Sequence, residues 1–174
     1  MDWVLRRASP GDAAVVSLVA SAAFLQTYAG VLPGTDIVAH CLLNNAPEKF
    51  AGWAADASSV VMLAEHPEGA APVGYTVLTA PDFPIPTGPS DIELKRIYTL
   101  AAAHGTGLGP ALITRAIADA RSLGRTRLLL GVHPGNARAR RFYERHGFRV
   151  IGTRVFRVGT GDLTMTDPVY ALAL

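Results

Sequence analysis

Residues 104–109 read His-Gly-Thr-Gly-Leu-Gly and connect a predicted strand to a predicted helix. Before them, Ile92 to Leu100 alternates like a strand, and after them Gly107 to Ser122 carries apolar residues at helical spacing. Glycines let a backbone approach a ligand closely and adopt positive φ angles. The helix that follows offers unpaired N–H groups and a positive dipole end. The turn is therefore a candidate site for phosphate oxygens, although a tight connection alone would also explain its glycines.

Two common nucleotide-binding motifs do not fit this turn. A P-loop requires G-x-x-x-x-G-K-[S/T], and no glycine of the turn is followed by Lys and then Ser or Thr. A dinucleotide-binding fingerprint requires G-x-G-x-x-G, and Pro110 stands where the final glycine would be. The predicted phosphate therefore belongs to another class of ligand.

A second motif lies downstream, where residues 136–148 read Asn-Ala-Arg-Ala-Arg-Arg-Phe-Tyr-Glu-Arg-His-Gly-Phe. The turn resembles the Q/R-x-x-G-x-G/A loop that binds acyl-CoA pyrophosphate in the GNAT N-acetyltransferase superfamily. The segment at 136–148 resembles that family's N-x-x-A-x-x-x-Y-x-[K/R]-x-G-F pattern nearly position for position. Both motifs occur in the family's order, and the resemblance covers about Ile92 to Gly152.

One position of the turn departs from the family pattern. His104 stands where the family usually has Gln or Arg. A neutral His would weaken a contact to phosphate, whereas a neighbouring phosphate would favour its protonation. A His that only caps the turn is the structural alternative.

The resemblance implies an enzyme that moves the acetyl group of acetyl-CoA to a primary amine, by direct attack through a tetrahedral intermediate. Acetyl-CoA would be the cosubstrate, and a small amine, a polyamine or a peptide N-terminus would be the acceptor. The strand before the turn would bind the pantetheine arm and the thioester oxygen through backbone groups. The residues implied to bind acetyl-CoA are Ile97, Tyr98, Thr99, His104, Gly105, Thr106, Gly107, Leu108, Gly109, Asn136 and Arg140.

Two residues are candidates for proton transfer, because acetyl transfer needs a neutral amine and a proton for the leaving thiolate. The resemblance places Tyr143 where many members carry the Tyr that protonates the thiolate; a phenol with a pKa of about 10 can donate at neutral pH. It places Glu93, eleven residues before His104, where some members carry a general-base Glu. Lys95 shares the strand face of Glu93 and could pair with it. A core aromatic and a solvated carboxylate are the structural alternatives.

Three functions stay open at this stage. The first is the N-acetyltransferase, and the second is a non-catalytic acyl-CoA-binding module that kept the turn but lost catalysis. A nucleotide-binding protein without CoA is the third. For the cluster Arg138, Arg140, Arg141 and Arg145, a solvated face is the default interpretation, and a nucleic-acid patch or a set of contacts to CoA phosphates are the alternatives.

The composition of the chain excludes several classes of protein and of binding site. Hydrophobic residues make up 49% and charged residues 17% of the 174 residues, which excludes intrinsic disorder. The net charge of +2 is too small to indicate bulk nucleic-acid binding. Cys41 is the single cysteine, so an intramolecular disulfide or a cysteine zinc site is excluded, and the histidines lack metal-ligand spacing. With no signal-peptide or membrane-span pattern, we expect a soluble cytoplasmic protein without metal; a homodimer stays open.

The order of elements predicts one domain over residues 1–174, with an α/β fold. We expect a GNAT-like three-layer sandwich in which helices flank a mixed, mainly antiparallel sheet. Strands are predicted at 4–6, 59–65, 73–79, 92–100, 127–132, 148–158 and 169–174, and the second and third form a hairpin. Helices are predicted at 13–24, after 33–36, from 47, and at 107–122 and 136–146. The acceptor pocket is expected from residues 24–45 and 81–90.

Overall fold

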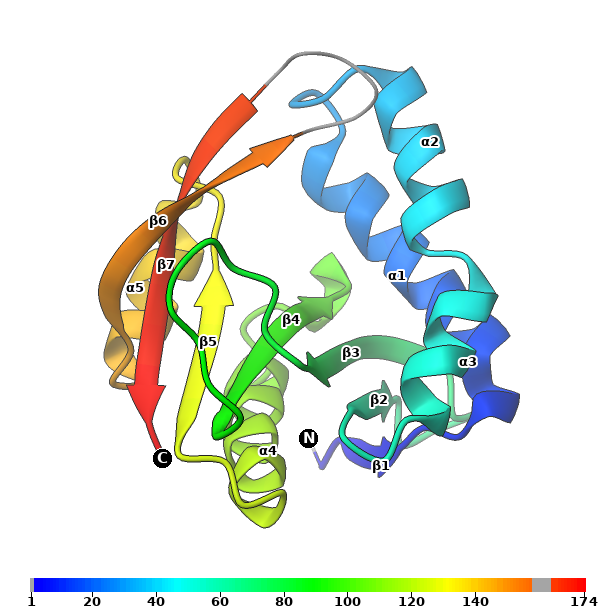
Figure 1. The fold of residues 1–174 in the computed structure, drawn as a ribbon. Coiled ribbons are helices and arrows are strands. Elements are labelled where there is room, and N and C mark those ends of the chain that lie inside the picture. Colours follow the sequence, from blue (N-terminus) through cyan, green and yellow to red (C-terminus); the bar gives the residue numbers. More distant parts are fainter. Residues whose placement is uncertain (1, 158–163) are drawn as a thin grey trace.

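A mixed sheet runs through the molecule (Figure 1). The computed structural model describes residues 2–157 and 164–174, with the side chains of 156, 157, 164 and 165 left aside. Within these residues the strands form one seven-stranded sheet in the order β1-β2-β3-β4-β5-β7-β6. The strands are β1 (Val4–Arg7), β2 (Val60–Glu65), β3 (Pro72–Thr79), β4 (Asp91–Thr99), β5 (Arg127–Gly131), β6 (Arg149–Arg157) and β7 (Thr164–Ala173). All neighbours are antiparallel except β4 and β5, which confirms the predicted mixed, mainly antiparallel sheet.

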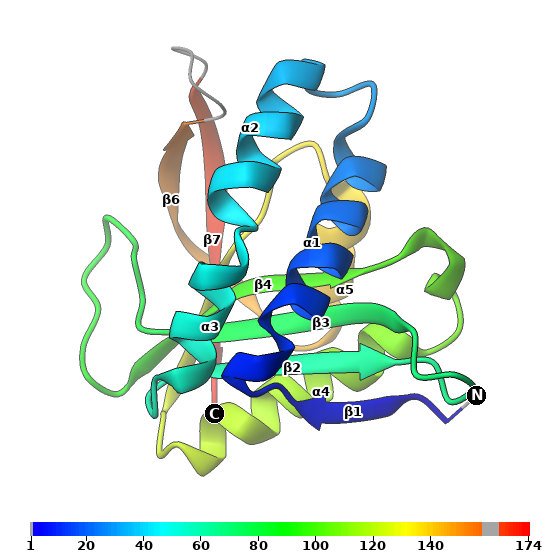
Figure 2. The same ribbon diagram turned by 90° about the vertical axis from the view of Figure 1, so that its right-hand side faces the viewer.

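Helices cover both faces of this sheet, which confirms the predicted three-layer sandwich. Figure 2 shows α1 and α3 on one side of β2, β3 and β4, and α4 on the other side. The helix α5 lies on the α4 side, because its Tyr143 belongs to the same core as the buried face of α4. The helices are α1 (Ala13–Tyr28), α2 (Gly34–Asn44), α3 (Pro47–Ala55), α4 (Leu108–Ser122) and α5 (Ala137–Arg145), with the short turns η1 (Pro10–Asp12) and η2 (Ala101–Ala103).

Alternation along β2 explains why the sheet is covered on both sides. Every residue of β2 is buried. Val60, Met62 and Ala64 belong to the core under α4, whereas Val61 and Leu63 belong to the core under α1 and α3. A strand that is apolar on both faces requires a layer on each face, and this strand has both.

The strands β4 and β5 pair over a short stretch and then separate, as Figure 1 shows. Their register joins Asp91–Glu93 to Arg127–Leu129, and beyond it β4 pairs with β3 and β5 pairs with β7. Leu94 and Arg96 pair with consecutive residues of β3, so Lys95 forms a bulge that bends β4. The edge of β4 after Glu93 therefore faces an opening instead of a neighbouring strand.

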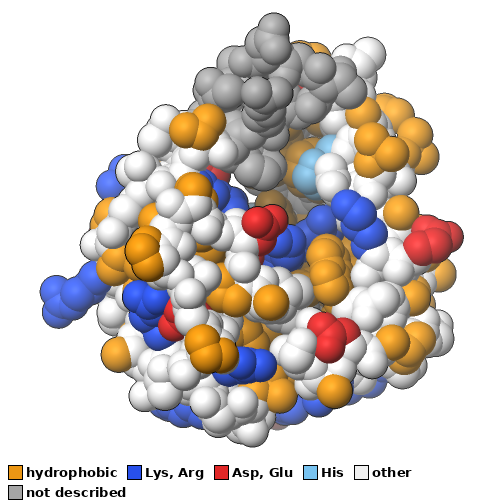
Figure 3. All heavy atoms as spheres, viewed as in Figure 1, with side chains coloured by type: hydrophobic (Ala, Val, Ile, Leu, Met, Phe, Trp, Pro, Cys, Tyr) orange, Lys and Arg blue, Asp and Glu red, His pale blue; other side chains and the backbone are white. Residues whose placement is uncertain are grey.

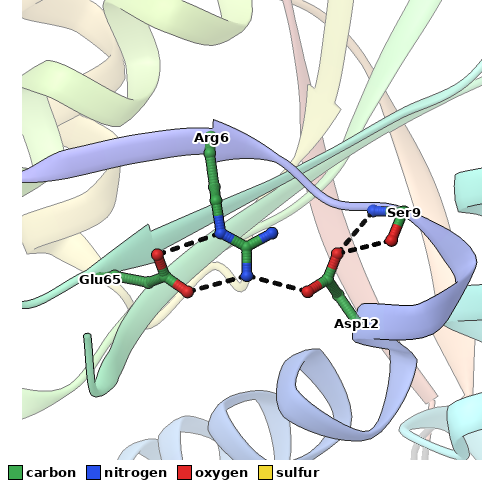
Figure 4. A network of polar contacts seen from close by, with 4 residues as sticks. All are labelled: Arg6, Ser9, Asp12 and Glu65. Atoms are coloured by element: carbon green, nitrogen blue, oxygen red, sulfur yellow. Dashed lines mark hydrogen bonds and ion pairs between the residues drawn. The ribbon is translucent and has the colours of Figure 1, made fainter. Parts of the chain in front are cut away.

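A polar network fixes the beginning of α1 against the sheet (Figure 4). The Arg6 guanidinium on β1 donates to Glu65 on β2, at 2.8 and 3.0 Å, and to Asp12 Oδ1 at 2.8 Å. Asp12 Oδ2 accepts from the backbone N–H and the hydroxyl of Ser9, both at 2.8 Å. These bonds to Arg6 and Ser9 hold the pKa of the Asp12 carboxyl well below its usual range.

Two elements extend several residues beyond their predicted bounds. The helix α1 continues past Phe24 to Tyr28, and the Thr27 hydroxyl bonds to the Ala23 carbonyl within that extra turn. The strand β7 begins at Thr164 rather than Val169, because β6 supplies pairing partners along its whole length. Residue 158, the predicted end of the preceding strand, lies outside the described residues. None of the described helices is long and apolar enough to cross a membrane.

Candidate active site

A cleft of about 1760 Å³ opens where β4 and β5 separate. Its walls come from α1 and α2 on one side and from β6, β7 and α5 on the other. Figure 3 shows the hollow, with basic and hydrophobic side chains along its floor. The lining includes most of the predicted site residues: Glu93, Ile97, Tyr98, Thr99, His104, Gly105, Gly107, Gly109, Asn136 and Tyr143. The structure thus brings these residues together around one cavity.

The glycine-rich turn requires its glycines for conformational reasons. Gly105 has φ +79° and Gly107 has φ +90°, a region that other residues rarely adopt. A Cβ at either position would meet no atom within 4 Å, so internal crowding is not the cause. Gly107 is the N-cap of α4, whose first N–H groups have no partner within the helix. The turn therefore presents bare backbone and a helix N-terminus at the cleft, which fits an extended ligand that carries phosphate.

His104 is in contact with an arginine from a distant helix. Arg138 Nη1 lies 3.1 Å from His104 Nδ1, and both residues line the cleft. This places a guanidinium beside the position where the family usually has Gln or Arg. Sequence reasoning grouped Arg138 with its neighbours and selected Arg140, because helical spacing alone does not say which arginine faces the turn.

Three predicted ligand-binding residues lie outside the cleft lining. Leu108 is fully buried in the core under α4. The Thr106 hydroxyl bonds to the Ala103 carbonyl at 2.6 Å and so braces the turn. Arg140 Nε donates to the Tyr170 hydroxyl at 3.2 Å. The roles of these three residues in ligand binding stay predictions. Burial or a hydrogen bond within the protein gives each of the three a structural role.

Side chains on the open edge of β4 are occupied by packing. Ile97 packs against the core under α4, and Tyr98 stacks on Tyr75 with ring centroids 5.9 Å apart. Asn136 is likewise engaged, since its Oδ1 accepts from the Ala139 N–H and caps α5. Any contact of Ile97, Tyr98 and Thr99 to a ligand would therefore use the backbone groups that β5 leaves unpaired.

Tyr143 lies in an aromatic cluster at the edge of the cleft. Its ring contacts Phe148 and Tyr170, and the residue is 8% exposed. Burial raises the pKa of its phenol well above the ordinary value. The hydroxyl is therefore protonated at neutral pH and can act as a donor.

Glu93 is a buried carboxylate with cationic neighbours. Its Oε2 accepts from the Asp82 N–H at 3.0 Å and lies 3.5 Å from Lys95 Nζ, which confirms the predicted pair with Lys95. Its Oε1 lies 3.8 Å from Arg154 Nη1. Burial raises the pKa of Glu93, and the charges of Lys95 and Arg154 oppose that rise only in part. A carboxylate with a raised pKa is a better proton acceptor than a solvated one.

The segments expected to form the acceptor pocket do line the cleft. Phe24 of α1 stacks on His40 of α2 with ring centroids 3.7 Å apart. Burial, together with Arg96 and Lys49, lowers the pKa of His40 to about 4, so the ring is neutral. From the second segment, residues 82–84 contribute to the lining.

Sequence reasoning missed several charged residues of the cleft. Arg96 of β4 donates to Asn45 Oδ1 at 2.7 Å and to the Asn44 carbonyl, and so fixes the connection between α2 and α3. Arg154, Asp167 and His133 line the other wall. No local signal singles these residues out, because Asp167 lay outside the predicted strand and Arg154 is one of several arginines. In the described residues, no group of three or more His, Cys, Asp or Glu side chains could hold a metal ion.

Comparisons with known proteins agree with this geometry. The family model described as the acetyltransferase (GNAT) family matches residues 33–148. An uncharacterized N-acetyltransferase of Mycobacterium bovis is 38% identical over 116 residues, 67% of this chain and 69% of that protein. A counterpart in Mycobacterium tuberculosis matches equally well.

Solved structures share the fold. The PaiA N-acetyltransferase of Thermoplasma acidophilum, solved with coenzyme A, has a TM-score of 0.79 at 20% identity, with all of both chains covered. YncA of Salmonella typhimurium, solved with acetyl-CoA, has a TM-score of 0.69 at 21% identity, over 100% of this chain and 95% of that one. The glycine turn, the open edge of β4 and the match over residues 33–148 lead to one conclusion: the chain belongs to the GNAT family of acetyltransferases.

Proposed function

We propose that this protein transfers the acetyl group of acetyl-CoA to the nitrogen of a primary amine, with Glu93 and Tyr143 handling the protons. Family membership makes the chain an acetyl-CoA-dependent acyltransferase, and the acceptor and the residue roles are our proposal. The observation that carries it is the separation of β4 and β5 directly beside the positive-φ turn. This juxtaposition offers an open strand edge for an extended thioester and a helix N-terminus for its phosphates.

In this proposal the turn binds the donor. The backbone N–H groups at Gly105–Gly109 bind the pyrophosphate, and Arg138 adds a positive charge beside His104. The unpaired backbone of Ile97, Tyr98 and Thr99 binds the pantetheine arm and the thioester oxygen, the latter as an oxyanion-stabilising contact. Asn136 orients the start of α5, which carries Tyr143 toward the same cleft.

Proton transfer completes the reaction. Glu93, directly or through one water, accepts a proton from the amine nitrogen as that nitrogen forms its bond to the acetyl carbon. The Tyr143 hydroxyl donates a proton to the sulfur as the carbon–sulfur bond breaks. The buried position of both residues supports these roles, because burial raises both pKa values and keeps the phenol protonated.

The alternative is a non-catalytic module that binds acyl-CoA. Such a module would bind acyl-CoA at the same turn but would not convert it to free CoA when amines are added. A small amine, a polyamine and a peptide N-terminus all stay within the proposed acceptor class. A cytoplasmic location and a homodimer stay predictions from the sequence.

Tyr143→Phe tests the proposed acid. The ring and its packing remain, whereas the donor is lost, so kcat should fall by about 10²–10⁴-fold with little change in the affinity for acetyl-CoA. The measurement is CoA release with an amine accepted from a panel of primary amines, together with calorimetry for acetyl-CoA.

Tyr170→Phe is the matched control. Tyr170 is also buried and its hydroxyl donates to Glu144 at 3.0 Å, but it does not line the cleft. Loss of the Tyr170 hydroxyl should lower the free energy of unfolding by about 0.5–1.5 kcal/mol and leave kcat of the folded protein unchanged. A kcat near the wild-type value in Tyr143→Phe would refute the acid assignment.

A further inference from the structure

A second buried carboxylate lines the cleft on the wall opposite α1 and α2. Asp167 of β7 is 5% exposed, and its Oδ2 lies 3.5 Å from Arg154 Nε. Among the described residues, Asp167 Oδ1 is buried and has no hydrogen-bond partner. Buried carboxylate oxygens are normally hydrogen-bonded, so an unsatisfied one on a residue that lines a cleft indicates a missing ligand.

A buried donor of His133 belongs to the same cleft lining. The Val132 N–H donates to the Pro168 carbonyl at 3.2 Å. The backbone at His133 therefore follows a residue that is bonded to the neighbour of Asp167. His133 Nδ1 accepts from the Gly135 N–H at 3.0 Å, which leaves the proton of the neutral ring on Nε2. Among the residues described, His133 Nε2 is also buried without a partner. This wall of the cleft therefore carries one acceptor and one donor that are both buried and both without a partner among the described residues.

The same wall is linked electrostatically to Glu93. Arg154 extends from β6 over Gly131 of β5, where an added Cβ would come within 2.7 Å of the guanidinium carbon. It lies 3.8 Å from Glu93 and 3.5 Å from Asp167 and so connects the two carboxylates. The ion pairs on this side of the cleft thus connect Glu93, Lys95, Arg154 and Asp167. The formal charges of these four groups cancel, so the four together do not repel a cationic ligand.

We propose that Asp167 and His133 form the docking site for the acceptor, with Asp167 Oδ1 accepting from its ammonium group and His133 Nε2–H donating to an oxygen near that nitrogen. The inference rests on the proposed function and narrows its acceptor to primary amines with an adjacent hydroxyl or carbonyl oxygen. Burial raises the pKa of Asp167 despite Arg154 and His133, so an ammonium would supply the charge compensation that these neighbours leave incomplete.

Binding without turnover tests the site. The probes are 2-amino-1-phenylethanol, 2-phenylethylamine, which lacks the hydroxyl, and 2-phenylethanol, which lacks the amine; the phenyl group suits the wall of Phe24 and Tyr28. Each is titrated by NMR into the full chain saturated with CoA. We expect 2-amino-1-phenylethanol to bind at least tenfold more tightly than 2-phenylethanol and several-fold more tightly than 2-phenylethylamine.

Asp167→Asn keeps the shape of the side chain and removes its charge. It should weaken binding of both amines at least tenfold and leave 2-phenylethanol unaffected. Asp91→Asn is the matched control, because Asp91 is equally buried, pairs with Arg127 at 2.6 Å and lies outside the cleft lining. It should bind all three probes as the wild type does.

The outcomes separate this inference from the proposed function. Equal affinity of Asp167→Asn and wild type for the amines, no binding of either amine, or no advantage of the hydroxyl would overturn the docking site. Acetylation of amines could still occur in that case, and the proposed function would stand. If amine binding depends on Asp167 but no amine in a panel leads to formation of free CoA from acetyl-CoA, the docking site stands and the proposed transfer fails.

Discussion

Gly107 shows how one residue can control ligand binding through backbone conformation. Its φ of +90° strains any other residue, and its position at the N-cap of α4 puts a new side chain beside the proposed pyrophosphate site. Gly107→Val should therefore weaken acetyl-CoA binding by at least tenfold, about 1.4 kcal/mol. Calorimetry on the folded variant measures this loss.

Gly124 offers a control for the backbone strain alone. It has φ +69° just beyond the end of α4, lies outside the cleft lining, and a Cβ there would meet nothing within 4 Å. Gly124→Val should lower the melting temperature but bind acetyl-CoA normally. Unchanged affinity in Gly107→Val would remove the turn from the donor site.

Glu93 should make stability fall as pH rises. Burial raises its pKa in the folded state, so the folded state favours the protonated carboxyl. This contribution to the free energy of unfolding is complete below the unfolded pKa and is lost as pH rises through the folded one. Gln is neutral throughout, so the melting temperature of Glu93→Gln minus that of the wild type should increase from pH 4 to pH 8. A difference that decreases with pH would mean that Lys95 and Arg154 outweigh burial.

At the scale of elements, the side chains of Arg6, Asp12 and Glu65 join β1, η1 and β2. Asp12 accepts three hydrogen bonds there, and its pKa is lowered in the folded state. Its contribution to stability therefore depends on pH in the direction opposite to that of Glu93. The contribution of Asp12 is complete above the unfolded pKa of about 4 and is lost as pH falls toward the folded value.

Asp12→Asn should lower the free energy of unfolding by about 1 kcal/mol at pH 7, or about 2–4 °C in melting temperature. The deficit should shrink below pH 4, where the wild-type carboxyl itself becomes protonated. Scanning calorimetry at pH 7 and pH 3 measures both values. Acetyl-CoA affinity should be unchanged, because the network lies outside the cleft lining; a deficit that is constant with pH would contradict the role of the charge.

The presence of most helices and strands follows from local sequence patterns. The residues at which these elements begin and end do not. The helix α4 matched its apolar spacing and its glycine turn within one residue. The strand β7 began five residues before its predicted start, because its first half is stabilised by pairing with β6 rather than by its own hydrophobicity. That half carries Asp167, so the sequence pattern missed the residue together with the strand.

At the scale of the whole molecule, the cleft depends on strand order. The sheet places β7 between β5 and β6, which lets Arg154 reach across two strands to Glu93. The bulge at Lys95 and the short β4–β5 register leave the opening on one side of β4. One sheet runs from β1 to β6 through both halves of the chain, which favours the single domain over residues 1–174 that stays a prediction.

The sequence by itself determined the glycine turn, the motif at 136–148, the alternating order of elements and, through them, the family. These features are local, since helical period, capping and turn preferences depend on residues within a few positions of one another. Only the tertiary structure decided which charged side chains meet. Arg138 contacts a residue 34 positions away, and Arg154 connects carboxylates on two other strands. Such contacts depend on the register and order of strands, which hydrogen bonding and burial fix for the molecule as a whole.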